Sequence, residues 1–233
     1  LGLSAKTSPS AIDVHTFAAM DSPLLISTPV LEAPSNGKPA IGASVADETN
    51  IEVTNPATGK PIAYVKCADA SVVDAAVAAA KAALPGWAGL TVKRRAQIML
   101  RFHALIEDHR QELVDLIVKE NGKNVTEAAG DVAKGLETVE WACSLPQLAQ
   151  GRILPVSSGV TCHEEHEPVG VVASIVPFNF PFMVPMWTAP IALVAGNCVL
   201  LKPSEKVPMT MGRAAQLMHK AGVPPAAFQL LHG

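Results

Sequence analysis

One short segment combines apolar side chains, a restricted backbone and a single amide group. It reads PFNFPFMVPMW and runs from Pro177 to Trp187. Its three prolines would interrupt most helices and strands, so we expect Asn179 to lie in a stiff, apolar loop. A fixed amide can stabilise negative charge that develops on a substrate. It can also satisfy backbone groups in an irregular loop, and the residues alone favour this second role.

A second candidate follows the apolar run CVLLK, which is typical of a buried strand. Lys202 ends this run, and Glu205 comes three residues later. Open α/β sheets bind ligands outside the carboxyl ends of their strands, so this pair is placed to contact one. The same letters, KPSE, also suit an exposed turn that opens the next helix, with Ser204 and Glu205 near its N-terminus.

The segment CHEEH, from Cys162 to His166, has the composition of a metal site. The zincin pattern needs two histidines four residues apart on a helix, whereas His163 and His166 are three apart. The flanking residues indicate a strand or hairpin, which would send the two histidines to opposite faces. We therefore expect a polar, half-exposed strand here and no metal.

The four cysteines are far apart in the chain and share no metal-type spacing. This pattern predicts free thiols in a reducing compartment. They are Cys67, Cys143, Cys162 and Cys198.

Composition narrows the range of partners. Hydrophobic residues make up 49% of the 233 residues, enough for a sizeable core, and the net charge of −3 gives no electrostatic reason to expect nucleic acid or an anionic membrane. No run reaches the ~18 apolar residues of a membrane span, so we expect a soluble chain. The one basic cluster is interpreted as a solvated helix face; it consists of Lys93, Arg94, Arg95 and Arg101.

The chain divides into four segments. Residues 1–50 are rich in Ser, Pro, Ala and Thr and contain no arginine, which predicts a processed remnant or a loosely docked arm in place of an intact transit peptide. Residues 51–150 are predicted to be mostly helical after a short strand pair. Residues 151–168 are predicted to be strands, and residues 169–233 alternate strand and helix.

Local signals place the ends of the helices. A capping-box spacing predicts that Ser71 opens the first helix, with a stop at Pro85-Gly86, and Thr91 begins the next. A third helix is expected to end at Asn121-Gly122. Asn124 with Glu127 is predicted to cap a fourth helix.

The fourth helix contains Gly130 and Gly135, each of which costs about 1 kcal/mol against alanine. We interpret the two glycines as marks of close packing against another element or of open space beside the helix.

The final segment predicts half of a doubly wound α/β sheet. PVGVVASIV is a continuous β-branched run, typical of a strand buried on both faces. An apolar helix, the strand CVLLK, a helix ending in glycine and a third strand, FQLLHG, follow it. No G-x-G-x-x-G follows the first strand, so the usual dinucleotide fingerprint is absent.

Several blocks in the same order resemble the aldehyde dehydrogenase superfamily, over roughly Asn36 to Gly233. PFNFP, GN and LKPSE are similar to superfamily motifs. VTNPATGKPIAYV, ENGKN, GDVAKGLETVEWAC and LKPSEKVP most closely resemble the acylating, coenzyme A-using methylmalonate-semialdehyde dehydrogenase branch. The resemblance implies an NAD-binding domain, incomplete in this chain and preceded by a helical segment. The implied activity is NAD-dependent, CoA-acylating oxidation of methylmalonate or malonate semialdehyde.

The resemblance also implies roles for single residues. Asn179 would be the oxyanion donor. Lys202 and Glu205 would contact the adenosine ribose of NAD, and Val176 and Phe178 would line the path of the dinucleotide. A carboxylate at Glu205 would repel a 2′-phosphate and so favour NAD over NADP.

Two positions depart from the family pattern. Lys134 stands where the family has an arginine that binds the substrate carboxylate, and Lys206 stands where an arginine usually follows the S-E pair in the cofactor site. Lysine keeps the charge but loses the planar, bidentate fork.

The family's catalytic cysteine and general-base glutamate have no counterpart in this chain, and none of the four cysteines lies in a matching motif. Two hypotheses follow: the N-terminal portion of an active enzyme, or a non-catalytic relative that is a structural subunit of a larger assembly.

The resemblance implies a mitochondrial matrix protein, or a cytoplasmic one in a bacterium. It also implies subunit contacts through residues 151–168, in a homo-oligomer or a larger complex.

Overall fold

The computed structural model describes residues 30–32 and 50–233. Most of the predicted N-terminal arm therefore lies outside the described residues. The elements, in chain order, are β1 Val30–Glu32, β2 Asn50–Thr54, β3 Pro61–Lys66, α1 Ala70–Ala88, α2 Val92–Asp108, α3 Arg110–Asn121, α4 Val125–Cys143, α5 Leu145–Leu148, β4 Arg152–Ser157, β5 Val160–Glu164, β6 Val171–Ile175, α6 Met183–Val194, β7 Cys198–Lys202, α7 Pro208–Ala221 and β8 Phe228–Leu230.

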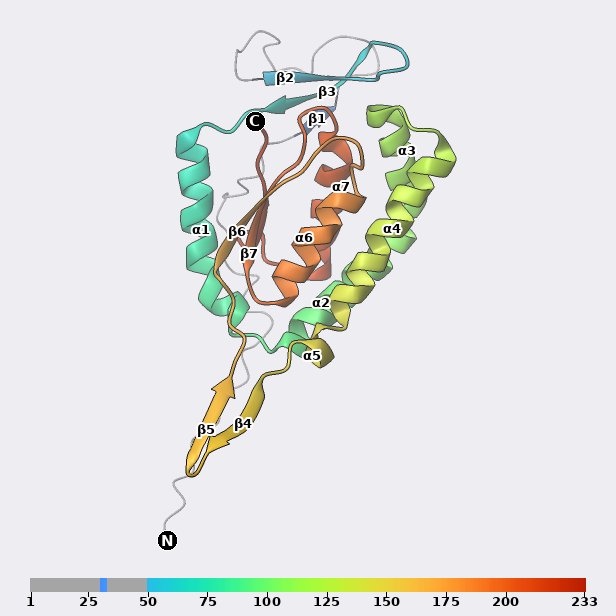
Figure 1. Ribbon diagram of the computed structural model, residues 1–233. Coiled ribbons are helices and arrows are strands. Elements are labelled where there is room, and N and C mark those ends of the chain that lie inside the picture. Colours follow the sequence, from blue (N-terminus) through green and yellow to red (C-terminus); the bar gives the residue numbers. More distant parts are fainter. Residues whose placement is uncertain (1–29, 33–49) are drawn as a thin grey trace.

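A three-stranded parallel sheet, in the order β6-β7-β8, forms the centre of the fold (Figure 1). The register runs from Val171 opposite Cys198 to Ile175 opposite Lys202, so β6 and β7 end at the same edge. Figure 1 shows α1 on one side of this sheet and α6 and α7 on the other, with α2, α3 and α4 packed outside them. The predicted α/β class, with a partial doubly wound sheet after a helical segment, is confirmed.

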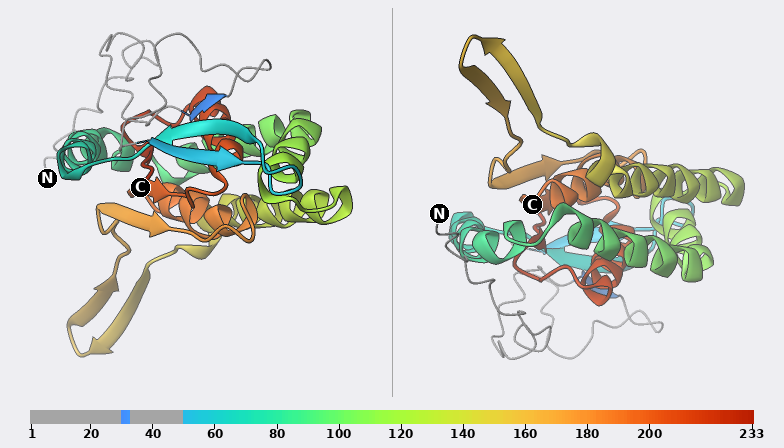
Figure 2. Two further views of the ribbon diagram at one scale, coloured as in Figure 1. Left: turned by 90° about the horizontal axis from the view of Figure 1, so that it is seen from above. Right: turned by 90° about the horizontal axis from the view of Figure 1, so that it is seen from below.

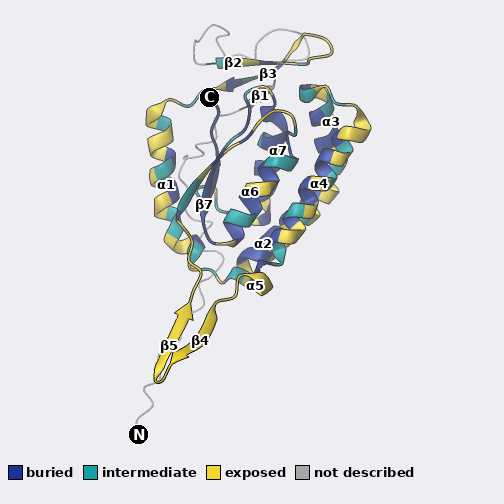
Figure 3. Cartoon of the chain, viewed as in Figure 1, coloured by how far each residue is buried: buried dark blue, intermediate teal, exposed yellow. Residues whose placement is uncertain are grey.

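The prediction that the first strand of this sheet is buried on both faces was wrong. Within the described residues β6 pairs only with β7, and Ile175 is 78% exposed. The central strand β7, which lies between β6 and β8, is buried at four of its five residues and is almost continuously dark in Figure 3. The run of β-branched residues thus predicted the strand but not its place in the sheet, because such residues are common in both edge and central strands.

Most helix boundaries match the sequence signals. Thr91 caps α2, Asn124 accepts a hydrogen bond from the Glu127 amide at the start of α4, and Gly122 ends α3 in the left-handed conformation.

The two predicted ends of α1 were wrong. Asp69, not Ser71, accepts the hydrogen bond from the Val72 amide, at 2.9 Å, because it directly precedes the first helical residue. At the other end, Pro85 lies within the helix. Trp87 stabilises that last turn, since it is buried and its Nε1 donates to the Leu193 carbonyl at 3.0 Å.

The interpretation of the basic cluster as a solvated face was wrong for one member. Arg95 is only 7% exposed. Its guanidinium donates to the carbonyls of Val194 and Ala88, at 2.8 and 2.9 Å, and also to that of Leu90. It therefore closes the carboxyl ends of α6 and α1, where carbonyl groups lack helical partners and a cation is favourable.

An antiparallel hairpin of β4 and β5 extends away from the body of the molecule (Figures 1 and 2). Every residue of both strands is exposed. The predicted strands in residues 151–168 are thus present, and β5 is more exposed than the half-buried strand that we expected.

No single helix among the described residues is long and apolar enough to cross a membrane. The pair α1 and α2, bent by 111° at their junction, meets the length and composition criteria only when the two are taken together.

Candidate active site at the carboxyl edge of the parallel sheet

The predicted cofactor residues converge where β6 and β7 end. The Val176 amide donates to the Lys202 carbonyl at 3.1 Å, so the two chain segments remain paired one residue beyond the strand. Lys202 Nζ lies 3.3 Å from Glu205 Oε2. Lys206 Nζ lies 4.8 Å from the centre of the Phe178 ring. The structure thus brings all five residues to one edge, although they come from two separate loops.

The charges at this edge are coupled. A hydrogen bond from its own backbone amide, and then Lys202 and Lys206, hold the pKa of Glu205 below its ordinary value, so the carboxylate is ionised at neutral pH. Behind it, burial and then the charge of Lys202 lower the pKa of His232 to about 4. His232 is therefore a neutral ring beside Lys202, a neighbour that the sequence did not indicate.

Asn179 lies in the loop of residues 176–182, which we call the Asn179 loop. It is exposed, and its side-chain amide makes no hydrogen bond to any residue in the described part of the chain. The second role considered above, an asparagine that satisfies nearby backbone groups, therefore has no support in the geometry. No described residue occupies the amide, so it can donate to a bound molecule.

The neighbours of Asn179 are held from α3, α4 and the turn between them. Asn121 Nδ2 donates to the Phe178 carbonyl at 2.7 Å. The Asp131 carboxylate, whose side chain is fully buried, accepts from the Met183 amide at 2.7 Å and pairs with Lys123 at 2.9 Å. The sequence analysis did not single out Asn121, Lys123 or Asp131 as site residues.

Lys123 also contacts the loop directly, since its Nζ lies 3.9 Å from the centre of the Phe180 ring. A cation over an aromatic face is attracted by the ring quadrupole. The only signal in the sequence was the quoted block ENGKN, which places the polar side chains of Lys123 and Asn124 between two helices.

Glu120, the first residue of the same block, supports the second loop. Its two carboxylate oxygens accept from the amides of Met209 and Thr210, at 2.6 and 2.9 Å. These amides belong to the first turn of α7, directly after the loop that carries Lys202 and Glu205. Complete burial raises the pKa of Glu120 to about 7.

Lys134, the predicted carboxylate-binding residue, lies on the exposed face of α4. Its Nζ is 2.8 and 2.9 Å from the two oxygens of Glu137, and both side chains are more than 60% exposed. Exposed pairs of this kind contribute about 0–1 kcal/mol, so Lys134 can exchange Glu137 for another carboxylate. Its bonds do not connect it to the Asn179 loop.

Comparison with known proteins agrees with this geometry. Residues 43–233 match the aldehyde dehydrogenase family. The chain belongs to the aldehyde dehydrogenase family.

Its relatives include malonate-semialdehyde dehydrogenase 1 of Geobacillus kaustophilus, which is 44% identical over 192 residues, 82% of this chain and 39% of the relative. Malonate-semialdehyde dehydrogenase of Pseudomonas aeruginosa is 40% identical over 194 residues, again 82% and 39%. This aldehyde dehydrogenase chain thus spans about two fifths of the length of the curated relatives that it matches.

Solved structures of the same fold also match most of this chain and about two fifths of their own length. The putative methylmalonate-semialdehyde dehydrogenase of Sinorhizobium meliloti, complexed with NAD, has a TM-score of 0.78 and 35% identity, covering 88% of this chain and 40% of that one. The methylmalonate-semialdehyde dehydrogenase of Oceanimonas doudoroffii gives 0.79 and 38%, with 89% and 41% covered. An Escherichia coli NADP dependent enzyme gives 0.78 and 30%, with 91% and 43% covered.

Three of the four cysteines of this aldehyde dehydrogenase chain, Cys143, Cys162 and Cys198, lie away from Asn179. Cys198 begins β7 whereas Lys202 ends it, and a five-residue strand spans about 13 Å. Burial raises the pKa of Cys198 to about 11, and burial followed by Glu140 does the same for Cys143. Cys162 lies on the exposed hairpin, and Cys67 follows β3.

The CHEEH segment is divided by the end of β5. His163 lies in the strand and His166 lies beyond it, within 3.8 Å of Glu164. The described residues contain no group of three His, Cys, Asp or Glu side chains that could hold a metal ion.

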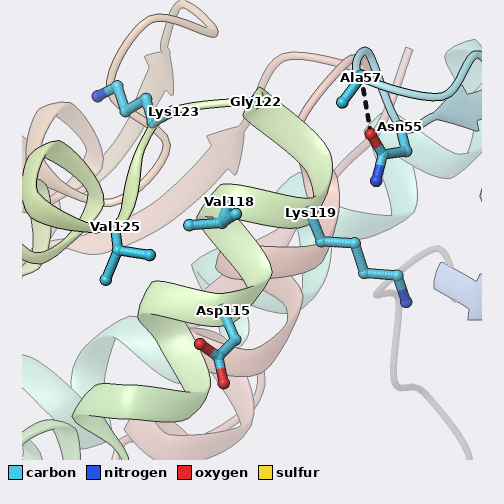
Figure 4. Close-up of a pocket in the computed structure, with 8 residues that line it drawn as sticks. All are labelled: Asn55, Ala57, Asp115, Val118, Lys119, Gly122, Lys123 and Val125. Atoms are coloured by element: carbon cyan, nitrogen blue, oxygen red, sulfur yellow. Dashed lines mark hydrogen bonds between the residues drawn. The ribbon is translucent and has the colours of Figure 1, made fainter.

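A separate, open pocket of about 370 Å³ lies between the turn after β2 and the end of α3 (Figure 4). Asn55 closes the turn by accepting a hydrogen bond from the Ala57 amide, at 2.9 Å. The pocket shares Lys123 with the contacts of the Asn179 loop but contains none of the predicted cofactor residues. The residues that line it are Asn55, Ala57, Asp115, Val118, Lys119, Gly122, Lys123 and Val125.

Proposed function

We propose that this chain supplies the dinucleotide-binding edge and the oxyanion donor of an NAD-dependent, CoA-acylating malonate or methylmalonate semialdehyde dehydrogenase. The observation that carries the proposal is the convergence of Val176, Phe178, Lys202, Glu205 and Lys206 at the carboxyl edge of the sheet. The names of the relatives and the NAD complex of one structural neighbour support it.

The residues at this edge fit a dinucleotide. Glu205 is ionised and can accept from two ribose hydroxyls, and Lys202 can donate to the same sugar after exchanging its partner Glu205. The ring of Phe178 is 49% exposed and offers an apolar wall. When bound, NAD would supply the hydride acceptor of the oxidation. Asn179 would donate a hydrogen bond to the oxygen that becomes negative as the aldehyde is attacked. Lys134 would bind a substrate carboxylate.

Titration calorimetry with NAD and NADP tests the cofactor part of the proposal. We expect tighter binding of NAD, because Glu205 repels a 2′-phosphate. Glu205→Gln should narrow the gap between the two affinities. Lys206→Met is the matched control, because it removes a positive charge from the same loop instead of a negative one. It should widen the gap, since that cation attracts a 2′-phosphate. Tighter binding of NADP by the unchanged chain would contradict the assignment.

A second candidate function is that of a non-catalytic subunit. The acyl-enzyme route needs a thiolate near the oxyanion donor, and Cys143, Cys162 and Cys198 are not placed there. We therefore expect the 233-residue chain to show no NAD-dependent oxidation of methylmalonate semialdehyde above background. Turnover that disappears in Cys198→Ala or Cys162→Ala would refute this expectation.

Under either function we propose subunit contacts through residues 151–168. The exposed side chains of Ile153, Leu154, Val156 and Val160 leave β4 and β5 with apolar surface to cover, and unpaired strand edges invite pairing. A monomer by light scattering, with free hydrogen exchange in this segment, would contradict the proposal.

A mitochondrial matrix location, or a cytoplasmic one for a bacterial chain, is proposed from the family alone.

A further inference from the structure

The Asn179 loop is held from outside at three points, and these points surround Asn179, whose side chain makes no hydrogen bond to any residue that the structure describes. Before Asn179, the Phe178 carbonyl accepts from Asn121. After it, the Phe180 ring lies under Lys123. At the start of α6, the Met183 amide donates to Asp131. The loop is therefore fixed on both sides of Asn179, while the amide of Asn179 stays exposed.

We propose that Asn121 and the Lys123–Asp131 pair are positioning residues that aim the Asn179 amide. This inference rests on the proposed oxyanion role of Asn179. A donor stabilises developing charge most when it is already oriented before the reaction. An exposed amide in an apolar loop has few internal contacts to orient it, so the orientation must come from the backbone on each side.

The burial of Asp131 and Lys123 distinguishes this pair from an ordinary surface ion pair. The Asp131 side chain is fully buried and that of Lys123 is 13% exposed. A buried pair contributes little net stability compared with apolar residues of the same size. It does fix geometry, because Asp131 uses one oxygen for Lys123 and the other for the Met183 amide.

The inference can be tested without turnover and without a cofactor. In the ¹⁵N-labelled chain, the side-chain amide signal of Asn179 is the one that Asn179→Ser removes. We expect Asn121→Ala to shift this signal toward the position of an unstructured asparagine and to lower the heteronuclear NOE of the amides of residues 178–180. The expected cause is greater motion of the loop backbone that carries Asn179.

Asn124→Ala is the matched control. Asn124 lies three residues further along and also uses its side chain for one hydrogen bond, to the Glu127 amide, but it does not touch the Asn179 loop. Both variants lose one such bond, so both melting temperatures should fall by a few degrees. Only Asn121→Ala should change the Asn179 signal. An unchanged signal in Asn121→Ala, or equal changes in both variants, would overturn the proposal.

The charged pair gives a second arm of the test. Lys123→Arg keeps a cation for Asp131 and for the Phe180 ring and should leave the Asn179 signal in place. Lys123→Met removes both contacts and should move it. If Lys123→Met alone fails to fold, the double variant Lys123→Met/Asp131→Asn removes the unpaired charge and carries the same expectation. A signal that moves equally in Lys123→Arg and Lys123→Met would refute positioning by this pair.

The readout of this test does not depend on NAD binding. Loss of NAD binding would refute the cofactor assignment and leave the Asn179 signals as a valid readout. An Asn179 loop unaffected by Asn121 and Lys123 would refute positioning even in a chain that binds NAD tightly.

Discussion

Replacing either of two glycines in α4 by alanine should change the stability of the fold, but in opposite directions. A Cβ atom added to Gly130 would meet no heavy atom within 4 Å. A Cβ atom added to Gly135 would lie 2.5 and 2.6 Å from two ring carbons of Phe182 and 3.3 Å from Met186. Ordinary carbon contacts are about 3.5–4.0 Å, so the Phe182 ring would have to move by about 1 Å.

The expected magnitudes follow from helix propensity and overpacking. Glycine to alanine inside a helix gains about 1 kcal/mol, and Gly130→Ala should show this gain in full. Gly135→Ala has the same gain, but overpacking a core costs about 1–3 kcal/mol. Phe182 is fully buried, so its ring cannot move aside into solvent, and we take the upper value. The net loss is about 2 kcal/mol.

Thermal unfolding, followed by circular dichroism, measures both effects. For a chain of this size about 1 kcal/mol corresponds to about 2–4 °C. Gly130→Ala should raise the melting temperature by about that amount, and Gly135→Ala should lower it by about twice as much. Phe182→Leu should be less costly in the Gly135→Ala background than alone, because it removes the contact. Equal shifts in the two alanine variants would show that the packing of Phe182 against α4 is wrong.

Two other buried polar groups give further predictions. Arg95→Met should lower the free energy of unfolding by about 2–4 kcal/mol, because it leaves buried carbonyls without donors, and Arg95→Lys should lower it less; a loss under about 0.5 kcal/mol, the usual range at the surface, would refute the buried assignment. Glu120→Gln should cost about 1–3 kcal/mol in acid, since the NH₂ group of glutamine cannot accept from a backbone amide, whereas both oxygens of a protonated carboxyl group can. The pKa of Glu120 is raised from 4.5 to about 7, so its stabilising contribution is present in full below pH 4.5 and is lost as the pH rises through about 7. The stability gap between the two proteins should narrow over that window, and a constant gap would show that Glu120 does not titrate there.

The sequence predicted the elements of this fold well because its signals are local. Asn124 and Thr91 are capping residues that act within three positions, and Gly122 stops a helix by its own backbone freedom. The carboxyl end of α1 was mispredicted because Trp87, which holds its last turn, bonds to a residue 106 positions away. No local pattern reports such a contact.

The candidate site was only partly predictable for the same reason. Lys202 and Glu205 follow a recognisable strand, and Asn179 follows another, so parallel pairing brings them to one edge. The residues that support them come from α3 and α4, which are separated from both loops by fifty or more positions. Arg95 was predicted to be solvent-exposed and is buried. Nothing in the cationic cluster of its amphipathic helix indicated that one of the four side chains points inward.

The segment from Glu120 to Asn124 contacts four different parts of the molecule. Glu120 accepts from the first turn of α7, Asn121 donates to the Asn179 loop, and Lys123 pairs with Asp131. Gly122 lies against Pro56 with a positive φ, where a Cβ atom would come within 2.7 Å of the proline ring. Asn124 caps α4. A helix would send these side chains outward at regular intervals on one cylinder, whereas a helix end followed by a cap points them to separate neighbours. The turn between α3 and α4 thus joins the two loops of the candidate site, since Glu120 supports the one that carries Glu205 and Asn121 holds the one that carries Asn179.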